Sequence, residues 1–410
     1  MNKNIAIVYV CFVVLIFNVA AGQERRDTGA FIDYEDEFKD QLKKQTGKED
    51  EITGVTKKFK MDFMGISLPE SIEQFKQAWH QDVISQDLTG TCWSFSATSF
   101  FESEVQRLTG QKVKLPEMYA VYWEYVEKAR RFVQHRGDSV FSKGAQPDGV
   151  RHIYKQYGIV PADAYRGIAS SQTILDDSKM FDEMDKYLES VKSSNAWNED
   201  IVIGTIRSIL DSYMGRPPER VLIDNRQMTP LEYLKETLKL DMDDYVDVMS
   251  LMEKPSYQQA EYKVADNWRC SAEYYNLPLD DFMNIIKTAV RNGCTVCIAG
   301  DTSEAGLMPR LDVAMIPTFD IPSSYIDQYA RQLRFSNEST TDDHAIHLVG
   351  YLEKDGHDWY LIKDSGTPAR HGKNKGYFFY HDDFVKLKMM NFMVHKDILK
   401  QVVGEKITIK

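Results

Sequence analysis

The run Gln86-Asp87-Leu88-Thr89-Gly90-Thr91-Cys92-Trp93-Ser94-Phe95 indicates the fold more strongly than any other part of the chain. After Cys92, apolar residues recur at helical spacing as far as Leu108, and Gly110 follows as a typical stop, so we predict a helix that begins at Cys92. The unpaired N–H groups and the dipole of a helix N-terminus favour the thiolate form of a cysteine placed there. The Gln86 amide, in the loop before the helix, can donate one of the two hydrogen bonds that hold a tetrahedral oxyanion. This run therefore predicts a cysteine nucleophile that forms a thioester.

A histidine and an aspartate far downstream supply the groups that such a thiol needs. His344 stands at the start of a β-type run, and an imidazole there can ionise the thiol and protonate the leaving group. Asp364 follows a second strand-like run, 359–363, where a carboxylate can fix the other ring nitrogen of the histidine. We therefore predict these catalytic residues: Cys92 as nucleophile, His344 as general acid and base, Asp364 as orienter and Gln86 as oxyanion donor.

The sequence predicts no metal or cofactor site. His347 follows His344 too closely on a strand for the two rings to share a face, so they do not form a metal site. Cys294 and Cys297 form a CxxC pattern, but the run 294–299 is typical of a buried strand. Two residues at this spacing also face opposite ways on a strand, so we interpret both thiols as core residues.

The composition indicates a folded chain without a nucleic-acid partner. A length of 410 residues suggests two domains, or one domain with large insertions. The hydrophobic fraction of 43% argues against disorder, and the formal charge of −12 argues against nucleic-acid binding. Five cysteines in so long a chain do not make a disulfide scaffold.

Residues 1–21 look like a secretory signal. Lys3 gives a weakly positive end, residues 5–17 form an apolar run too short for a comfortable membrane span, and residues 19–21 offer small side chains for cleavage. Cys11 lies within this run. We therefore expect an exported protein, periplasmic, secreted or at the cell surface, with no integral membrane association after cleavage.

Helical patterns fill the middle of the chain, and β-type runs follow Gly293. The predicted fold class is α+β, with two lobes and a cleft between them where the nucleophile and the base meet. The expected segments are a signal at 1–21, a charged N-terminal arm at 22–75, a helical catalytic lobe at 76–170 with Cys92, a helical insertion at 171–290, and an antiparallel β lobe at 291–410 with His344 and Asp364.

The quoted motifs resemble the papain-like cysteine peptidases, and within them the bleomycin hydrolase branch, whose members are often called aminopeptidase C. The likeness is strongest at 86–95, 343–351 and 359–365, and it extends loosely over about 75–397. It implies a papain-like two-lobed fold, peptide substrates and a homo-oligomer. It supports the roles given to Gln86, Cys92 and His344, and it adds substrate-binding residues: Gly144, Ala145 and Trp93.

The sequence also departs from that branch. Asp364 stands where those enzymes usually have Asn in an Asn-Ser-Trp-Gly run, and no Trp follows Ser365. A carboxylate still orients the imidazole and further favours its charged form. The branch places a C-terminal arm in its cleft to limit cutting to N-terminal residues, whereas only a short tail follows residue 397 here. Its members are mostly cytoplasmic, whereas we expect export.

We therefore expect an exported cysteine peptidase that hydrolyses peptide bonds through a Cys92 thioester, from the N-terminus of short peptides. Two alternatives stay open. A Cys-His-Asp set also serves acyl transfer of the transglutaminase type. The missing Trp after Ser365 would also fit a peptide-binding surface protein without catalysis.

Overall fold

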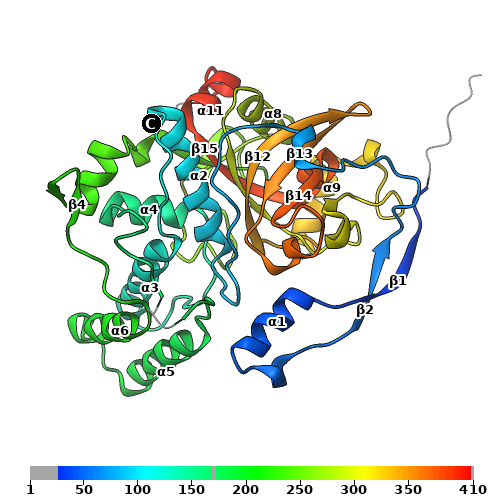
Figure 1. Cartoon of the computed structure of the whole chain (residues 1–410). Helices are drawn as coiled ribbons and strands as arrows, with labels where there is room; N and C mark the ends of the chain where they lie inside the picture. Colours follow the sequence, from blue (N-terminus) through cyan, green and yellow to red (C-terminus); the bar gives the residue numbers. More distant parts are fainter. Residues whose placement is uncertain (1–25, 169–171, 408–410) are drawn as a thin grey trace, which may run out of the picture.

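Helix α2 (Cys92–Thr109) begins at the cysteine, as predicted, and packs against strand β12 (His344–Lys354), which begins at the histidine. Gly110 ends the helix with a φ of 75°, a left-handed conformation that glycine adopts without strain. The computed structural model describes residues 26–168 and 172–407 (Figure 1). Within those ranges, no helix is both long and apolar enough to cross a membrane.

The helices between residues 92 and 214 gather on one side of the molecule (Figure 1). Their apolar faces share one buried cluster, which includes Phe100, Tyr122 and Leu210. The helices of the chain besides α2 are α1 (Glu37–Gln45), α3 (Glu117–Gln134), α4 (Asp148–Tyr157), α5 (Ser178–Ser194), α6 (Glu199–Met214), α7 (Pro230–Glu232), α8 (Leu279–Arg291), α9 (Gln328–Ser336), α10 (Asp382–Lys388) and α11 (Lys396–Val403).

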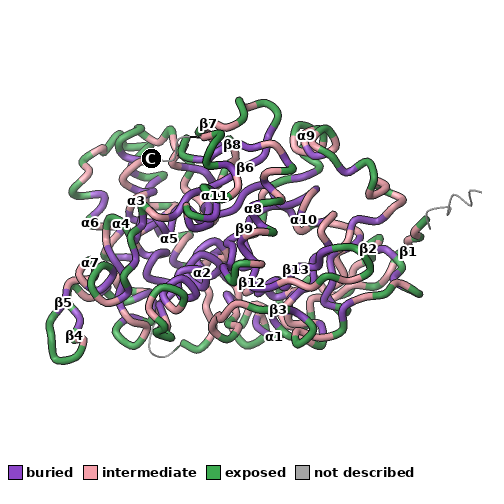
Figure 2. The backbone as a smooth tube through the Cα atoms, turned by 90° about the horizontal axis from the view of Figure 1, so that it is seen from above, coloured by how far each residue is buried: buried purple, intermediate pink, exposed green. Residues whose placement is uncertain are grey.

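An 11-stranded sheet forms the other side, with the order β10-β11-β14-β13-β12-β9-β15-β6-β8-β7 and β3 paired to β12. Its strands besides β12 are β3 (Lys76–Gln77), β6 (Tyr245–Met249), β7 (Gln258–Ala260), β8 (Tyr274–Asn276), β9 (Val296–Gly300), β10 (Leu307–Met308), β11 (Val313–Ala314), β13 (His357–Lys363), β14 (Tyr377–His381) and β15 (Met389–His395). The central pairs are antiparallel, whereas β11 with β14 and β6 with β8 are parallel. Figure 2 shows α2 and the strands beside it buried along most of their length.

The segment 171–290 is not helical throughout, unlike the predicted insertion. It contains helices α5, α6 and α7, but it also contains a small hairpin of β4 (Val221–Ile223) and β5 (Arg226–Met228). Strand β6 then joins the large sheet beside β15, and every residue of β6 is buried. A short, uniformly buried run carries no alternation, so periodicity does not separate such a strand from part of a buried helix.

The N-terminal arm carries regular structure. Strand β1 (Gly29–Tyr34) pairs with β2 (Thr56–Met61), and α1 lies between them along the chain. The arm is anchored by Met61, Phe63 and Phe75, which are buried in one cluster with residues of β13 and β14. The signal-like run 1–21, with Cys11, lies outside the described residues.

A buried arginine joins several elements of the sheet side. Arg331 of α9 is fully buried and donates to three backbone carbonyls, those of Ser250, Lys386 and Met390, at 2.9–3.1 Å. Its guanidinium also lies 4.9 Å from the ring centroid of Phe282. The side chain therefore links the end of β6, helices α8 and α10, and strand β15.

We predict that Arg331→Ala lowers the free energy of unfolding by about 3–5 kcal/mol, because three buried carbonyls lose their donor. Arg334→Ala on the same helix removes a pair with the exposed Asp320 and is expected to cost at most about 1 kcal/mol. Urea titrations of both variants measure the difference. Equal losses in the two variants would contradict the structural role given to Arg331.

Candidate active site

Gln86 is held on both sides of its amide group. Its Oε1 accepts a hydrogen bond from Ser365 Oγ at 2.8 Å, and its Nε2 donates to the Thr89 carbonyl at 2.8 Å. An amide NH₂ has two protons, so one N–H remains for another acceptor. The backbone N–H of Cys92 lies in the first turn of α2, where no intrahelical acceptor exists. These two donors suit an oxyanion that forms beside the sulfur.

Cys92 and His344 contact each other across the two sides of the molecule. The thiol is free and partly exposed, and its side chain is hydrogen-bonded to the imidazole. Burial disfavours a charge on the ring, but Asp364 and Cys92 outweigh that effect and raise the pKa of His344 well above 6.5. A charged imidazole beside a sulfur at a helix N-terminus is the environment that stabilises a thiolate.

Asp364 fixes the orientation of the ring. Its Oδ1 accepts from His344 Nε2 at 2.9 Å and from the Gly366 N–H at 2.7 Å. Since Nε2 faces the carboxylate, Nδ1 remains for the sulfur. Burial alone would raise the pKa of Asp364, but His344, Gly366 and Arg370 outweigh it and hold that pKa below its usual range. The carboxylate is therefore charged at neutral pH and favours the imidazolium.

The backbone of Gly366 covers the histidine–aspartate pair where the resembled enzymes have a Trp. A methyl group built on Gly366 would lie 3.2 Å from Asp364 Oδ1 and 3.5 Å from His344 Nε2. The chain therefore passes within van der Waals distance of the hydrogen bond. This close approach replaces part of the shielding that an indole ring would give.

A cavity of about 500 Å³ lies beside this group, and the N-terminal arm forms part of its wall. The lining includes Gln86, His344 and Asp364 together with residues of the arm, namely Lys39, Lys43, Lys48 and Glu51. The arm is tied to the sheet side through Asp36, which accepts from Thr367 Oγ1 at 2.8 Å. It is tied to the helical side through Lys48, which pairs with Asp176 at 2.7 Å. The arm thus spans the cleft beside His344 (Figure 1).

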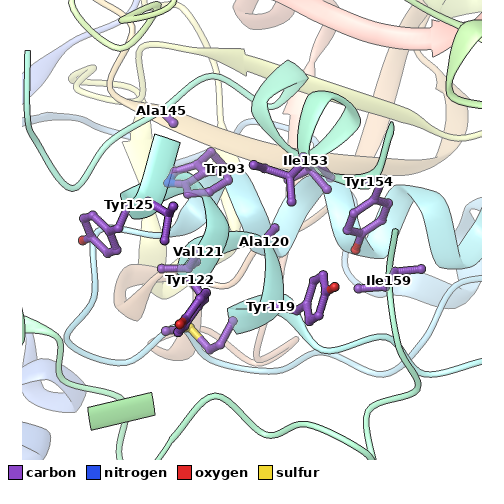
Figure 3. Close-up of a cluster of buried hydrophobic side chains, with 14 of the residues drawn as sticks. Trp93, Tyr119, Ala120, Val121, Tyr122, Tyr125, Ala145, Ile153, Tyr154 and Ile159 are labelled. Atoms are coloured by element: carbon purple, nitrogen blue, oxygen red, sulfur yellow. The ribbon is translucent and has the colours of Figure 1, made fainter. Parts of the chain in front are cut away.

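The predicted substrate-binding residues are not among the lining residues of this cavity. Trp93 is 1% exposed, and its Nε1 donates to the Lys143 carbonyl at 3.3 Å (Figure 3). The prediction that Trp93 binds substrate is therefore corrected: the indole packs in the core and supports the loop that precedes Gly144. Ala145 is also buried, so its side chain does not face the cleft. Gly144 is partly exposed beside this loop.

The other thiols and His347 lie apart from this site. Cys294 and Cys297 are free and buried in different core clusters, as predicted from their spacing. His347 Nδ1 is 2.8 Å from Ser99 Oγ inside the core. Within the described residues, one group could hold a metal ion by its spacing: His357, His381 and Asp382, which already form ion pairs with one another.

Two supporting residues escaped the sequence analysis. Ser365 follows Asp364 directly, so its position in the motif could have suggested the contact with Gln86. Arg370 is a half-buried cation near Asp364, and its Nε and Nη2 have no hydrogen-bond partner within the described ranges. No local sequence pattern marks Arg370. Its side chain comes near Asp364 only because the short turn Thr367–Arg370 folds back.

Comparison with known proteins places this geometry in a family context. The model of the Peptidase C1-like family matches residues 33–409. Aminopeptidase C of Listeria innocua is 22% identical over 372 residues, covering 80% of this chain and 83% of that protein. Aminopeptidase C of Streptococcus thermophilus is 23% identical over 375 residues, covering 78% and 81%. The crystal structure of PepW from Lactobacillus rhamnosis HN001 superposes with a TM-score of 0.64 at 18% identity, covering 80% and 84%, and supports the papain-like fold.

The expected export is wrong by this comparison. The similar proteins are named aminopeptidase C, the branch whose members are mostly cytoplasmic, whereas export was inferred from residues 1–21 alone. A short apolar run near the start of a chain is a weak signal, because it needs only a few apolar residues in sequence.

We predict that Asp364→Asn lowers the pKa of His344, since the neutral amide no longer favours the charged ring. The change is measured by NMR titration of protein labelled with ¹³C-histidine, with the His344 signal assigned by its loss in His344→Gln. Because the pKa is raised in the native protein, the imidazolium persists to higher pH there than in the variant. An unchanged pKa would contradict the role of the carboxylate.

Proposed function

The chain belongs to the Peptidase C1-like family, as a papain-like cysteine peptidase of the bleomycin hydrolase and aminopeptidase C branch, and on this premise we propose that it is an aminopeptidase acting through Cys92. The observation that carries the proposal is the hydrogen-bonded series from Cys92 through His344 to Asp364, with the Gln86 amide beside it. Such a series provides a nucleophile, a proton carrier and an oxyanion donor in one place.

The proposed reaction begins with attack of the Cys92 thiolate on the carbonyl carbon of the first peptide bond. The oxyanion that forms accepts hydrogen bonds from Gln86 Nε2 and from the Cys92 N–H. The imidazolium of His344 gives its proton to the leaving amine as the C–N bond breaks, which leaves a thioester. The neutral ring then takes a proton from water, and the hydroxide releases the amino acid and restores the thiolate.

Two observations support action on short peptides with a free N-terminus. The similar proteins from Listeria innocua and Streptococcus thermophilus are named aminopeptidase C. In addition, the arm at 36–51 is tied to both sides of the cleft beside His344, the group that protonates the departing amine. An arm in this position limits the length of chain that fits on the leaving-group side.

The C-terminal segment takes a different course from the arm that limits cutting in the resembled branch. Lys406 pairs with Asp281 of α8 at 2.9 Å, and Ile407 packs on the cluster of the sheet side. As far as residue 407, the tail does not line the cavity beside His344. A homo-oligomer, which the resemblance implies, belongs to this proposal, and light scattering of the purified protein checks it.

We predict that Cys92→Ala lowers kcat/KM for fluorogenic aminoacyl amides by at least about 10⁴-fold, because the thioester cannot form. The matched control is Cys270→Ala, which removes an exposed free thiol and is expected to leave the rate unchanged. N-acetylated versions of the same amides are expected to be poor substrates. Hydrolysis that persists in Cys92→Ala, or equal cleavage of blocked and free substrates, would refute the proposed activity.

We further predict that Gln86→Ala lowers kcat by about 10²–10³-fold with little change in KM, since the lost donor acts on the oxyanion. Gln134→Ala, at the exposed end of α3, serves as control. The kinetic constants for one aminoacyl amide separate the two effects. A rise in KM at constant kcat would instead assign Gln86 to substrate binding.

A further inference from the structure

The carboxylate of Asp266 lies directly over Gly144, in the loop that contacts Trp93 next to the nucleophile. A methyl group built on Gly144 would lie 2.5 Å from Asp266 Oδ1, so this approach requires glycine. The segment before Gly144 contacts the nucleophile region twice. Trp93 donates to the Lys143 carbonyl, and a methyl group on Gly90 would lie 3.0 Å from Lys143 Cβ. Asp266 therefore lies against Gly144, and the preceding residue, Lys143, contacts both Gly90 and Trp93 beside the nucleophile.

Asp266 has no hydrogen-bond or ion-pair partner within the described parts of the chain, although it is mostly buried. Burial raises the pKa of its carboxyl group, and the charge of Lys128 partly offsets this. Lys128 itself does not reach the carboxylate, because its Nζ donates to the Ser142 carbonyl at 2.7 Å and to the Gly144 carbonyl at 2.5 Å. A partly buried acid without a donor can accept a cation from a ligand.

Asp266 lines a second cavity, of about 560 Å³, which is formed by residues of the segments 253–266 and 335–342. Its lining is acidic, with Lys263 as the one cation among its acids Glu253, Asp266, Glu338 and Asp342. Asp342 lies across from Asp266, just before His344 in sequence, and its Oδ2 accepts from Gln146 Nε2 at 2.6 Å. Burial raises the pKa of Asp342 to about 7, and repulsion from the negative charge of Asp266 adds to this effect. A cation in this cavity would relieve that repulsion.

We propose that Asp266 binds the N-terminal ammonium group of the substrate and thereby determines that the enzyme acts as an aminopeptidase. The inference rests on the proposed function and adds the residue that recognises the free amine of the substrate. The partner is the ammonium of a peptide or aminoacyl amide, whose positive charge pairs with the unpartnered carboxylate in a place shielded from water.

The geometry of an N-terminal residue favours this wall of the cleft. Its nitrogen and carbonyl carbon are both bonded to one Cα, so the ammonium lies only about 2.5 Å from the carbon that the sulfur attacks. A counter-charge must therefore line the cleft next to the nucleophile, on the side away from the leaving amine. Asp266 lies against Gly144, which follows the residue that Gly90 and Trp93 contact, whereas the lysines of the N-terminal arm line the cavity beside His344.

The same contacts exclude a longer chain. A substrate strand that continued past the first residue would need the backbone edge of Gly144 as a pairing partner, as the resemblance implies. The Gly144 carbonyl already accepts from Lys128, and Asp266 covers the Cα. An acetyl group on the substrate amine would meet the carboxylate without offering a charge, so blocked peptides bind poorly.

The test compares Asp266→Asn with the native enzyme on matched aminoacyl and N-acetylaminoacyl amides. We expect kcat/KM for the free amine to fall about 10- to 100-fold, and the ratio of free to blocked substrate to fall by the same factor, because one charge-assisted contact is lost. Asp200→Asn, the same change at an exposed aspartate in the first turn of α6, is expected to leave the ratio unchanged. The ratio of the two kcat/KM values measures recognition of the amine. A loss of folded protein lowers both values by the same factor and leaves the ratio unchanged.

The outcomes separate this inference from the proposed function. If the native protein shows no Cys92-dependent hydrolysis of aminoacyl amides, the proposed function fails. If the native enzyme prefers free amines and Asp266→Asn keeps the full preference, the inference fails while the function stands. Should Asp266→Asn not fold, Asp266→Glu provides the second variant. That longer side chain keeps the charge but moves it, and we expect the preference for free amines to fall at least several-fold.

Discussion

The contact between the Cys92 sulfur and the His344 ring is the interaction on which the rest of the structure depends. The sulfur starts α2 and the ring starts β12, so the contact exists only while the helix and the sheet stay packed. A second contact along the same two elements holds this packing. Ser99 of α2 lies 2.8 Å from His347 Nδ1 and accepts from Lys363 Nζ at 2.9 Å. Burial first, and then Lys363, lower the pKa of His347 well below 6.5, so this second histidine is a neutral structural residue while His344 is charged.

The sequence predicted the parts of the molecule that local pattern determines. The glycine stop of α2 and the runs that became β12, β13, β14 and β15 are local features, and the pairing of β12 with β13 follows from their short separation. The placement of Cys92, His344 and Asp364 could be expected because each one begins or directly follows such an element, and Gln86 lies in the short loop before α2. Their catalytic roles remain a proposal.

The features that the sequence did not predict arise from contacts between distant segments. Strand β6 pairs with β15, far along the chain, and nothing near residue 245 indicates that partner. Trp93 adjoins the nucleophile in sequence, but the helix turns its ring into the core. Asp266 is one of many acidic loop residues, and only the fold brings it over Gly144. The fold thus brings three lysines of the arm to the cavity beside His344 and four carboxylates to the second cavity.

The most direct test of the sulfur–imidazole site is a crystal structure of the enzyme inactivated with an aminoacyl chloromethyl ketone that has a free amine. We expect one covalent bond, a thioether between the reagent's methylene carbon and Cys92 Sγ, which forms as chloride leaves. We also expect the ketone-derived oxygen to lie within hydrogen-bond distance of Gln86 Nε2, and the ammonium to lie beside Asp266. Attachment to another thiol, or an oxygen that points away from Gln86, would contradict the account.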